Sequence, residues 1–237
     1  MRARSRFSIT FWAVLWTAFL VQGCAWLPIQ DVESEDRSPT EEELRALYLD
    51  ERVFMVQKPV DGSKTNCDFC TVVMDDLRAE AFLQTKSYVA ASLVDPSFFD
   101  MDWNTGVMSR REFLNGFRAQ DTMVVADVTG ALLREWLSTS LSKHVIRQSG
   151  MRITVLLSEP AQLGSVLIER DILEPQKRYR VATTRESLTN LLDASDGTGV
   201  EVVWSAPEAL EEWLIQKNEA TRALRQTQED QRVMSVY

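Results

Sequence analysis

Apolar positions recur with two different periods from residue 52 onward. In residues 66–83, Phe69, Val73 and Leu77 follow one another at helical spacing, and residues 130–141 repeat that spacing around Trp136. Short runs rich in β-branched residues lie between such stretches and are typical of strands. Because helices and strands interleave, we expect an α+β (mixed α/β) domain with helices layered on a mixed sheet. The pattern predicts strands at residues 52–57, 87–94, 122–128, 152–157, 165–170, 178–183 and 200–204, and a last helix after residues 205–208.

Two helix starts carry capping signals. Ser109 is followed three residues later by Glu112, which is the spacing of a capping box. Upstream, Ser38 is predicted to cap a short helix, with Pro39 at its first position and Glu41 completing a second box. We therefore expect one helix to begin directly after Ser109 and another directly after Ser38.

The first residues have the composition of an export signal. Three arginines lie within the first six positions, and residues 7–21 form an uncharged, largely apolar stretch. This stretch has the length of a signal-peptide core and is short for a helix that spans a bilayer. We therefore expect residues 1–23 to be a signal peptide that directs export from the cytoplasm.

The end of this stretch, Leu20-Val21-Gln22-Gly23-Cys24, resembles the lipobox of bacterial lipoproteins. The resemblance implies that the chain is cut before Cys24 and that the Cys24 thiol is acylated, which anchors the protein to the membrane of the cell envelope. Gln22 is larger than the residue usual at its position. Ala25, where some lipoproteins have Asp, implies the outer membrane, facing the periplasm. The alternative is an ordinary secretory signal with an incidental cysteine.

Charge and polarity divide the rest of the chain. We expect residues 24–51 to be an acidic spacer with a short helix, residues 52–216 to be the globular domain, and residues 217–237 to be a C-terminal helical tail. Removal of the signal would take away three arginines and no acid, so the formal net charge would move from -9 to -12. So acidic a chain is not expected to bind nucleic acid or to dock on anionic lipid through charge.

The chain contains one histidine, His144. Dinuclear phosphatase centres and most zinc hydrolase sites need several imidazoles. We therefore expect no metal, no cofactor and no catalytic residue, and we interpret His144 as a surface or helix-end residue.

A Cys-x-x-Cys pair, Cys67 and Cys70, stands at the start of the helix predicted over residues 66–83. Two cysteines at this spacing can be bridged, and a helix N-terminus lowers the pKa of a thiol. Cys70 is followed directly by Thr71 and not by a histidine, and no second cluster of ligands exists for zinc, so haem attachment and a structural zinc site are excluded. Three states stay open: a structural disulfide, a redox-active pair and two free thiols.

Aromatic and acidic residues mix in the loop of residues 95–106, where Phe98, Phe99 and Trp103 are interspersed with aspartates. Exposed aromatic side chains often mark an interface, so one interpretation is a binding lip. The other is that these rings cover an edge of the hydrophobic core.

Residues of about 66 to 204 resemble the C-terminal domain of the 5'-nucleotidase family. In that family the domain follows a dimetal phosphatase domain and supplies the pocket for the nucleoside. Each matching stretch is short, but their order and spacing agree. The stretches are Asp75-Asp-Leu-Arg78, Asn104-Thr-Gly-Val-Met-Ser109, Asp127-Val-Thr-Gly-Ala-Leu-Leu133, Gln148-Ser-Gly-Met-Arg152 and Glu174-Pro-Gln-Lys-Arg-Tyr-Arg-Val-Ala182.

The resemblance fails where the family binds its ligand. The two stretches that carry the stacking rings in the family fall on residues 118–121 and 194–197, which leaves Thr198 at one aromatic position. The stretch with the substrate-facing arginine falls on residues 92–97, which has no arginine. If a pocket survives, the resemblance assigns its ligand-binding residues as Phe117, Arg118, Asp121, Arg185 and Asp196.

Three functions are consistent with these features. The first is a membrane-anchored lipoprotein whose 5'-nucleotidase C-terminal-like domain is a non-catalytic binding or assembly module for an envelope protein. The second is a nucleoside- or nucleotide-binding accessory that acts beside a separate phosphatase in nucleotide catabolism. The third is a redox or disulfide-linked envelope factor that uses Cys67 and Cys70.

Overall fold

The computed structural model describes residues 38–64, 67–142, 145–193, 198–219 and 233–236. The predicted signal peptide and Cys24 lie outside these ranges, as do His144 and Asp196. Within the described ranges, no helix is both long enough and apolar enough to cross a membrane.

The chain divides into two compact units, residues 1–44 and 45–237. The described part of the first unit is the start of helix α2 (Glu41–Asp50) and the three residues before it. Thr40 begins this helix: its hydroxyl accepts a hydrogen bond from the Glu43 amide at 3.2 Å, and the Glu43 carboxylate accepts one from the Thr40 amide at 2.6 Å. The predicted box of Ser38 and Glu41 is therefore wrong by two residues.

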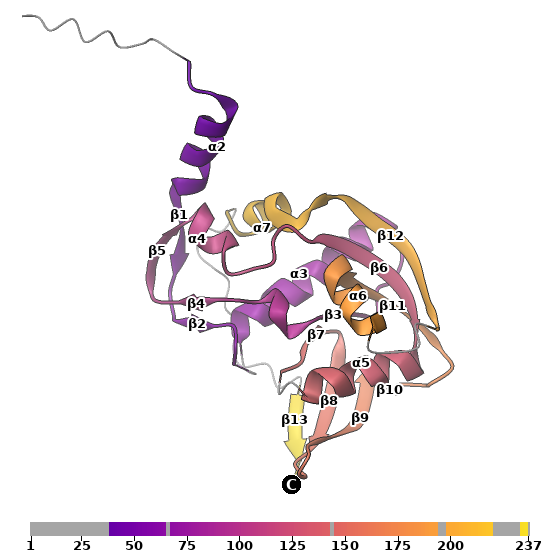
Figure 1. Cartoon of the computed structure of the whole chain (residues 1–237). Helices are drawn as coiled ribbons and strands as arrows, with labels where there is room; N and C mark the ends of the chain where they lie inside the picture. The colour runs from indigo at the N-terminus through magenta and orange to yellow at the C-terminus, as the bar shows by residue number, and fades with distance from the viewer. Residues whose placement is uncertain (1–37, 65–66, 143–144, 194–197, 220–232, 237) are drawn as a thin grey trace, which may run out of the picture. The chain divides into compact units, whose positions relative to one another are not determined.

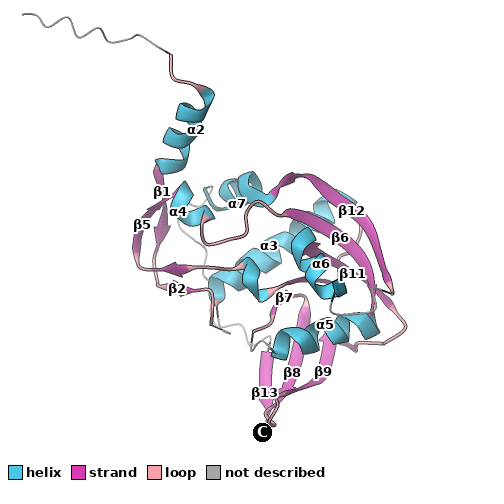
Figure 2. Cartoon of the chain, in the orientation of Figure 1, coloured by secondary structure: helices cyan, strands magenta, loops and turns pink. Residues whose placement is uncertain are grey.

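A five-stranded sheet forms the centre of the second unit, with the strand order β12-β6-β11-β3-β7 (Figures 1 and 2). The pair β11–β3 is parallel and the other three pairs are antiparallel. The mixed sheet and the helices on it confirm the predicted α+β class. The strands are β3 (Ala91–Val94), β6 (Thr122–Thr129), β7 (Arg147–Ser149), β11 (Arg178–Thr184) and β12 (Val200–Ala209).

Three smaller sheets surround this centre. Two are antiparallel pairs, β1 (Arg52–Val56) with β5 (Gly106–Ser109), and β2 (Val60–Asp61) with β4 (Asp102–Trp103). The third has four strands in the order β10-β9-β8-β13. Its strands are β8 (Met151–Leu156), β9 (Gln162–Ile168), β10 (Asp171–Ile172) and β13 (Val233–Val236).

Strand β13 corrects the expectation of a helical tail over residues 217–237. Helix α7 (Leu210–Glu219) ends near the start of that range, and Val233–Val236 instead pairs in parallel with β8. The reason is that β8 offers hydrogen-bonding groups on the side away from β9, and a short run rich in valine suits a strand. Strand β12 likewise runs five residues further than the predicted 200–204, through two irregularities in its pairing with β6.

The faces of the central sheet separate two hydrophobic cores. Val125 points into the first core, which contains Phe113 and Leu214, whereas its neighbours Val124 and Ala126 point into the second. This alternation follows from the two-residue period of a strand. The first core is covered by α3 (Asp68–Thr85), α4 (Arg110–Leu114) and α7, and the second by α5 (Gly130–Ser142), α6 (Arg185–Asp193) and the β8–β9 pair.

Local sequence signals account for the places where several helices and strands begin or end. The capping box is confirmed: Ser109 caps α4, and Glu112 accepts the Ser109 amide in return. Gly130 begins α5 so close to the backbone just before β11 that a Cβ atom would lie 2.2 Å from the carbonyl oxygen of Glu174. Gly150 has a φ of +83°, a conformation that favours glycine.

Candidate functional site

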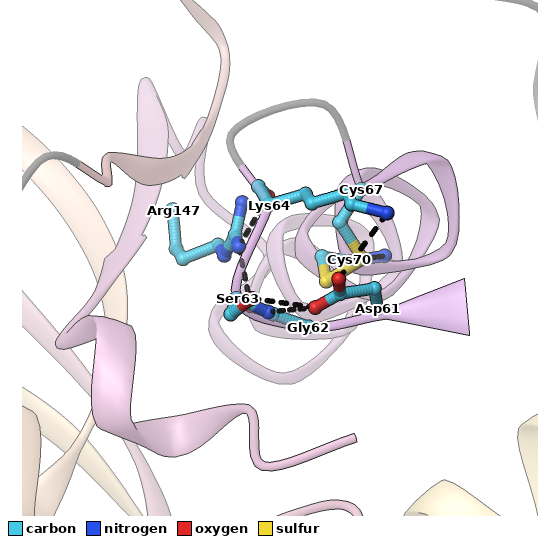
Figure 3. Close-up of a disulfide and its surroundings, with 7 residues drawn as sticks. All are labelled: Asp61, Gly62, Ser63, Lys64, Cys67, Cys70 and Arg147. Atoms are coloured by element: carbon cyan, nitrogen blue, oxygen red, sulfur yellow. Dashed lines mark hydrogen bonds and ion pairs between the residues drawn. A yellow bond between two sulfur atoms is a disulfide. The ribbon is translucent and has the colours of Figure 1, made fainter. Parts of the chain in front are cut away.

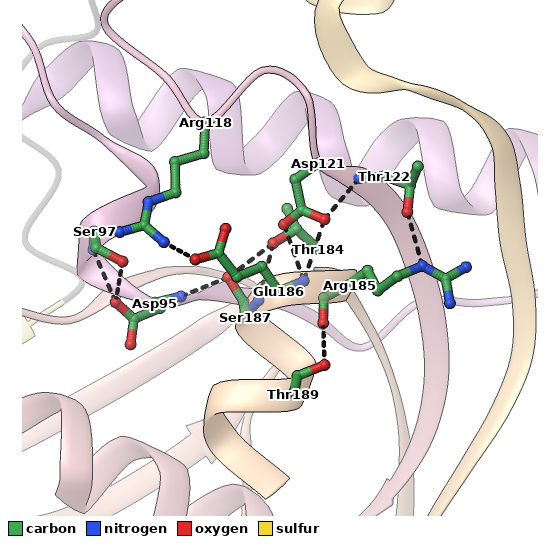
Figure 4. A network of polar contacts seen from close by, with 10 residues as sticks. All are labelled: Asp95, Ser97, Arg118, Asp121, Thr122, Thr184, Arg185, Glu186, Ser187 and Thr189. Carbon is green, nitrogen blue, oxygen red and sulfur yellow. Dashed lines mark hydrogen bonds and ion pairs between the residues drawn. The ribbon is translucent and has the colours of Figure 1, made fainter. Parts of the chain in front are cut away.

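Three segments that are distant in sequence meet at the N-terminus of α6 (Figure 4). They are the turn Asp95–Phe98, which includes a short 3-10 helix, the loop of residues 115–121 between α4 and β6, and the first residues of α6. Three of the predicted ligand-binding residues, Arg118, Asp121 and Arg185, lie at this junction.

Arg118 and Glu186 form an ion pair across this junction (Figure 4). Both side chains are a little under half exposed, at 43% and 45%. The hollow that they line with Asp95 and Asp121 measures about 140 Å³, even with open solvent included. Ligand pockets usually measure about 300–1,000 Å³. The hollow that the pair lines is therefore smaller than a typical ligand pocket.

Asp121 is used as a helix cap. Its carboxylate oxygens accept hydrogen bonds from the Glu186 amide at 3.0 and 3.2 Å and from the Thr122 amide at 2.7 Å. The Glu186 amide is one of the donors that a helix leaves unpaired at its start, so this carboxylate stabilises α6. The Asp121 carbonyl accepts the Leu210 amide at 2.8 Å, which ties the loop to the start of α7.

Arg185 points away from Arg118, toward the strands β6 and β12 (Figure 4). Its guanidinium donates to the Thr122 hydroxyl at 3.1 Å and to the Ser205 hydroxyl at 2.7 Å. Two neighbouring residues of one helix turn thus serve different contacts, because Glu186 faces the hollow and Arg185 faces the sheet edge.

A chain of short hydrogen bonds fills the inner wall. The Asp95 carboxylate accepts from the Ser97 amide at 2.9 Å and from its hydroxyl at 2.6 Å. The Asp95 amide donates to the Ser187 hydroxyl at 3.0 Å, and the Thr184 hydroxyl donates to that same oxygen at 2.8 Å. Asp95, Thr184 and Ser187 are all buried. This wall is held together by its own side chains.

Phe117 lies in the first core and is 7% exposed. Its ring centroid lies 5.1 Å from that of Phe113 and 5.9 Å from those of Phe98, Phe99 and Trp103. The Phe117 ring is therefore surrounded by other aromatic rings of the core. Phe98, Phe99 and Trp103 are themselves buried, so the interpretation of that loop as a cover for the core edge is confirmed. The fifth candidate, Asp196, lies outside the described residues.

Cys67 and Cys70 form a disulfide at the start of α3, which confirms the first of the three states considered for this pair (Figure 3). Cys67 is also the N-cap residue, because its sulfur accepts the Cys70 amide at 3.1 Å. Both cysteines are buried. Among the described residues, no group of three or more His, Cys, Asp or Glu side chains is placed to hold a metal ion.

Arg147, from β7, holds the segment beside the disulfide (Figure 3). Its guanidinium donates to the carbonyl oxygens of Gly62 at 2.5 Å and Lys64 at 2.6 Å. Burial lowers the pKa of Arg147 to about 10, against the raising effect of Asp61, so the group stays charged at neutral pH. Sequence reasoning did not identify this role.

Residues 53–189 match the family described as the 5'-nucleotidase, C-terminal domain. This match covers more than half of the chain. The chain belongs to the 5'-nucleotidase C-terminal domain family.

Solved structures with this fold agree with that assignment. A 5'-nucleotidase precursor from Thermus thermophilus superposes with a TM-score of 0.65 at 13% identity, over 82% of this chain and 42% of that chain. The NAD nucleotidase of Haemophilus influenzae gives 0.58 at 11% identity, over 83% and 40%. The sulfate thiohydrolase SoxB of Thermus thermophilus gives 0.56 at 15% identity, over 85% and 40%. A search of curated proteins found no match.

This member of the family spans about two fifths of the length of the solved relatives. The likeness at such low identity establishes the fold, and the relatives' own names cover both nucleotidases and a sulfate thiohydrolase. Sequence reasoning missed Glu186, although it directly follows the candidate Arg185. The signal that could have found it is an acidic side chain in the first turn of a helix, where the helix dipole favours a negative charge.

Proposed function

We propose that this protein is a lipid-anchored module of the cell envelope that keeps the 5'-nucleotidase C-terminal fold for binding or assembly and does not hydrolyse nucleotides by itself. Cys24 carries the lipid, and the outer membrane, facing the periplasm, is the expected place. The folded domain then binds a protein partner at that membrane.

The observation that carries the proposal is the ion pair between Arg118 and Glu186. It closes the hollow that Arg118 and Asp121 share, and the remaining volume is about 140 Å³. The carboxylate of Asp121 is engaged as a helix cap, and Phe117 is packed in the core. A nucleoside would need to break the ion pair and would find no ring of Phe117 on which to stack, which is a contact worth about 1–3 kcal/mol per base.

A thermal-shift assay with adenosine, AMP and a UDP-sugar tests the closed pocket. A ligand at a hundred times its dissociation constant stabilises a protein by about 2.7 kcal/mol, which is about 5–10 °C in Tm for a chain of this size. We expect no concentration-dependent shift, and an authentic 5'-nucleotidase serves as the positive control. A saturable shift would favour the alternative, a nucleoside-binding accessory to a separate phosphatase.

Two further measurements address the rest of the proposal. Metabolic labelling with a radioactive fatty acid should mark the wild-type chain and not the Cys24→Ala variant, and label on that variant would contradict the anchor. Phosphate release from AMP should fall with each purification step. Release that follows the purified chain through every step would show that it hydrolyses nucleotides.

A further inference from the structure

A groove lies between the second half of α2 and residues 208–215, at the end of β12 and the start of α7, within the second compact unit. Its volume is about 770 Å³ with open solvent included, against about 140 Å³ on the same measure for the hollow at α6, and the enclosed part of the groove is about 330 Å³. The floor is apolar and is made by Leu49 from α2 and Ile215 from α7, with the ring of Tyr48 at one side. Ile215 is buried, and Leu49 packs against the first core, so this floor is a fixed part of the domain.

The rim of the groove is acidic. Glu208, Glu211 and Glu212 line it, and Arg45 is the one basic residue in the lining. Arg45 is paired with Glu211 at 3.0 Å, and Glu211 also accepts the Gln120 amide group at 2.8 Å. Among the described residues, no cation pairs with Glu208 or Glu212. Glu212 accepts a hydrogen bond from the neutral Gln216 side chain at 3.0 Å. In the described part of the chain, the groove therefore presents two carboxylates without a cationic partner above an apolar floor.

Helix α2 supplies one wall while leaving most of its apolar surface outside the core. None of its residues is fully buried, and Leu47 and Tyr48 are 68% and 44% exposed. Polar contacts help to hold the helix. Arg110 donates to the Tyr48 carbonyl at 2.8 Å and to Glu51 at 2.7 Å, and the Tyr48 ring centroid lies 3.9 Å from the Arg110 guanidinium carbon. The groove is therefore bordered by apolar surface that a partner could cover.

We propose that this groove binds a basic segment of a partner protein, with a large aliphatic side chain on the floor and Lys or Arg side chains at the rim. The inference rests on the proposed role as an assembly module, for which it identifies the contact surface. Charge decides the class of partner, because a basic segment pairs with Glu208 and Glu212, whereas an acidic segment is repelled. The volume of about 330 Å³ lies at the small end of the range for binding pockets, which suits a short segment.

A fluorescence-anisotropy titration of the full chain in detergent tests this surface. The ligand is a labelled helical peptide of Leu, Lys and Ala, and its matched control replaces every Leu with Ser at the same charge. Two paired variants are compared. Glu208→Gln with Glu212→Gln removes the rim charge, and Asp171→Asn with Glu174→Gln removes the same charge on exposed residues elsewhere in the domain.

The Leu-containing peptide should bind, and the rim variant should weaken it by about fivefold to tenfold. The second variant and the wild type should bind it equally, and the Ser peptide should bind at least about tenfold more weakly. The proposal is overturned if both variants lose the same affinity, if the Ser peptide binds as well, or if no binding is seen up to about 1 mM.

Two other occupants give distinct results. A dimer in sedimentation that the rim variant abolishes would assign the groove to a second copy of the chain. Binding of a Cys24→Ala chain to neutral vesicles that Leu47→Ser abolishes would assign the exposed face of α2 to lipid. Either result would overturn the partner segment. A nucleoside shift in the thermal assay would contradict the proposed function without changing these peptide affinities, so the two failures are distinguishable.

Discussion

The disulfide between Cys67 and Cys70 should stabilise the domain in two separable ways. It closes a short loop, and it places the Cys67 sulfur where it accepts the Cys70 amide at the start of α3. A double change of Cys67→Ser and Cys70→Ala removes the bridge and keeps an N-cap acceptor. Changing both to Ala removes the bridge and the cap.

The magnitude follows from the spacing. For a loop of this size the chain-entropy relation gives about 2 kcal/mol for the bridge. Loss of an N-cap acceptor adds about 1 kcal/mol. Since 1 kcal/mol corresponds to about 2–4 °C in Tm for a chain of this size, the Ser/Ala variant should melt about 4–8 °C below wild type, and the Ala/Ala variant about 6–12 °C below.

Circular-dichroism melts of the three proteins, with thiol titration of the unfolded and unreduced chains, provide the test. Wild type should show no free thiol from Cys67 or Cys70. Reductant should lower the Tm of wild type only, and slowly, because both cysteines are buried. The reasoning is refuted if the Ser/Ala variant melts with wild type, or if both Ala and Ser at position 67 give the same Tm.

Other sites give equally definite expectations. Gly130→Ala places a Cβ atom 2.2 Å from a backbone carbonyl oxygen and should cost about 1–3 kcal/mol in urea unfolding. Phe113→Ala, at the centre of the aromatic cluster, should cost about 3–5 kcal/mol, whereas Phe82→Ala, half exposed, should cost much less. The hydrogen bonds from Arg180 hold the pKa of Asp127 below its ordinary value, so this carboxylate stabilises the fold above its unfolded pKa of about 3.9. That contribution is lost as the pH falls through the lower folded pKa, and Asp127→Asn should flatten the acid limb of a Tm-against-pH curve.

Signals within a few residues of one another were sufficient to place most elements. A short run rich in β-branched residues predicted β6, helical spacing predicted α3, and the pairing of Ser109 with Glu112 predicted where α4 begins. The error at α2 has the same local origin. Ser38 with Glu41 and Thr40 with Glu43 both have the spacing of a capping box, and the spacing alone does not say which pair the helix uses.

Such local signals do not predict contacts between residues that are distant in the sequence. Strand β13 forms because β8, about eighty residues earlier, has a free edge, and the tail sequence carries no mark of that edge. Arg118 and Asp121 were selected as candidates, but their partner Glu186 is more than sixty residues away. Arg147 was not selected, because the carbonyl groups that it binds become neighbours only when β2 and β7 have folded together.

The elements that the sequence predicts build the scaffold of the domain. The contacts that it does not predict include those at the candidate ligand site. The apolar positions of the strands and helices build the two cores, and Gly130 allows the close backbone approach at the start of α5. At the α6 junction, the charged groups bind one another: Arg118 to Glu186, and Asp121 to the helix start. A fold tolerates the replacement of ligand-binding side chains because its stability comes from the cores, whereas a binding site depends on a few side chains. The α6 junction thus satisfies its own charges, whereas Glu208 and Glu212 pair with no cation in the described part of the chain, which makes their rim the better surface for a partner.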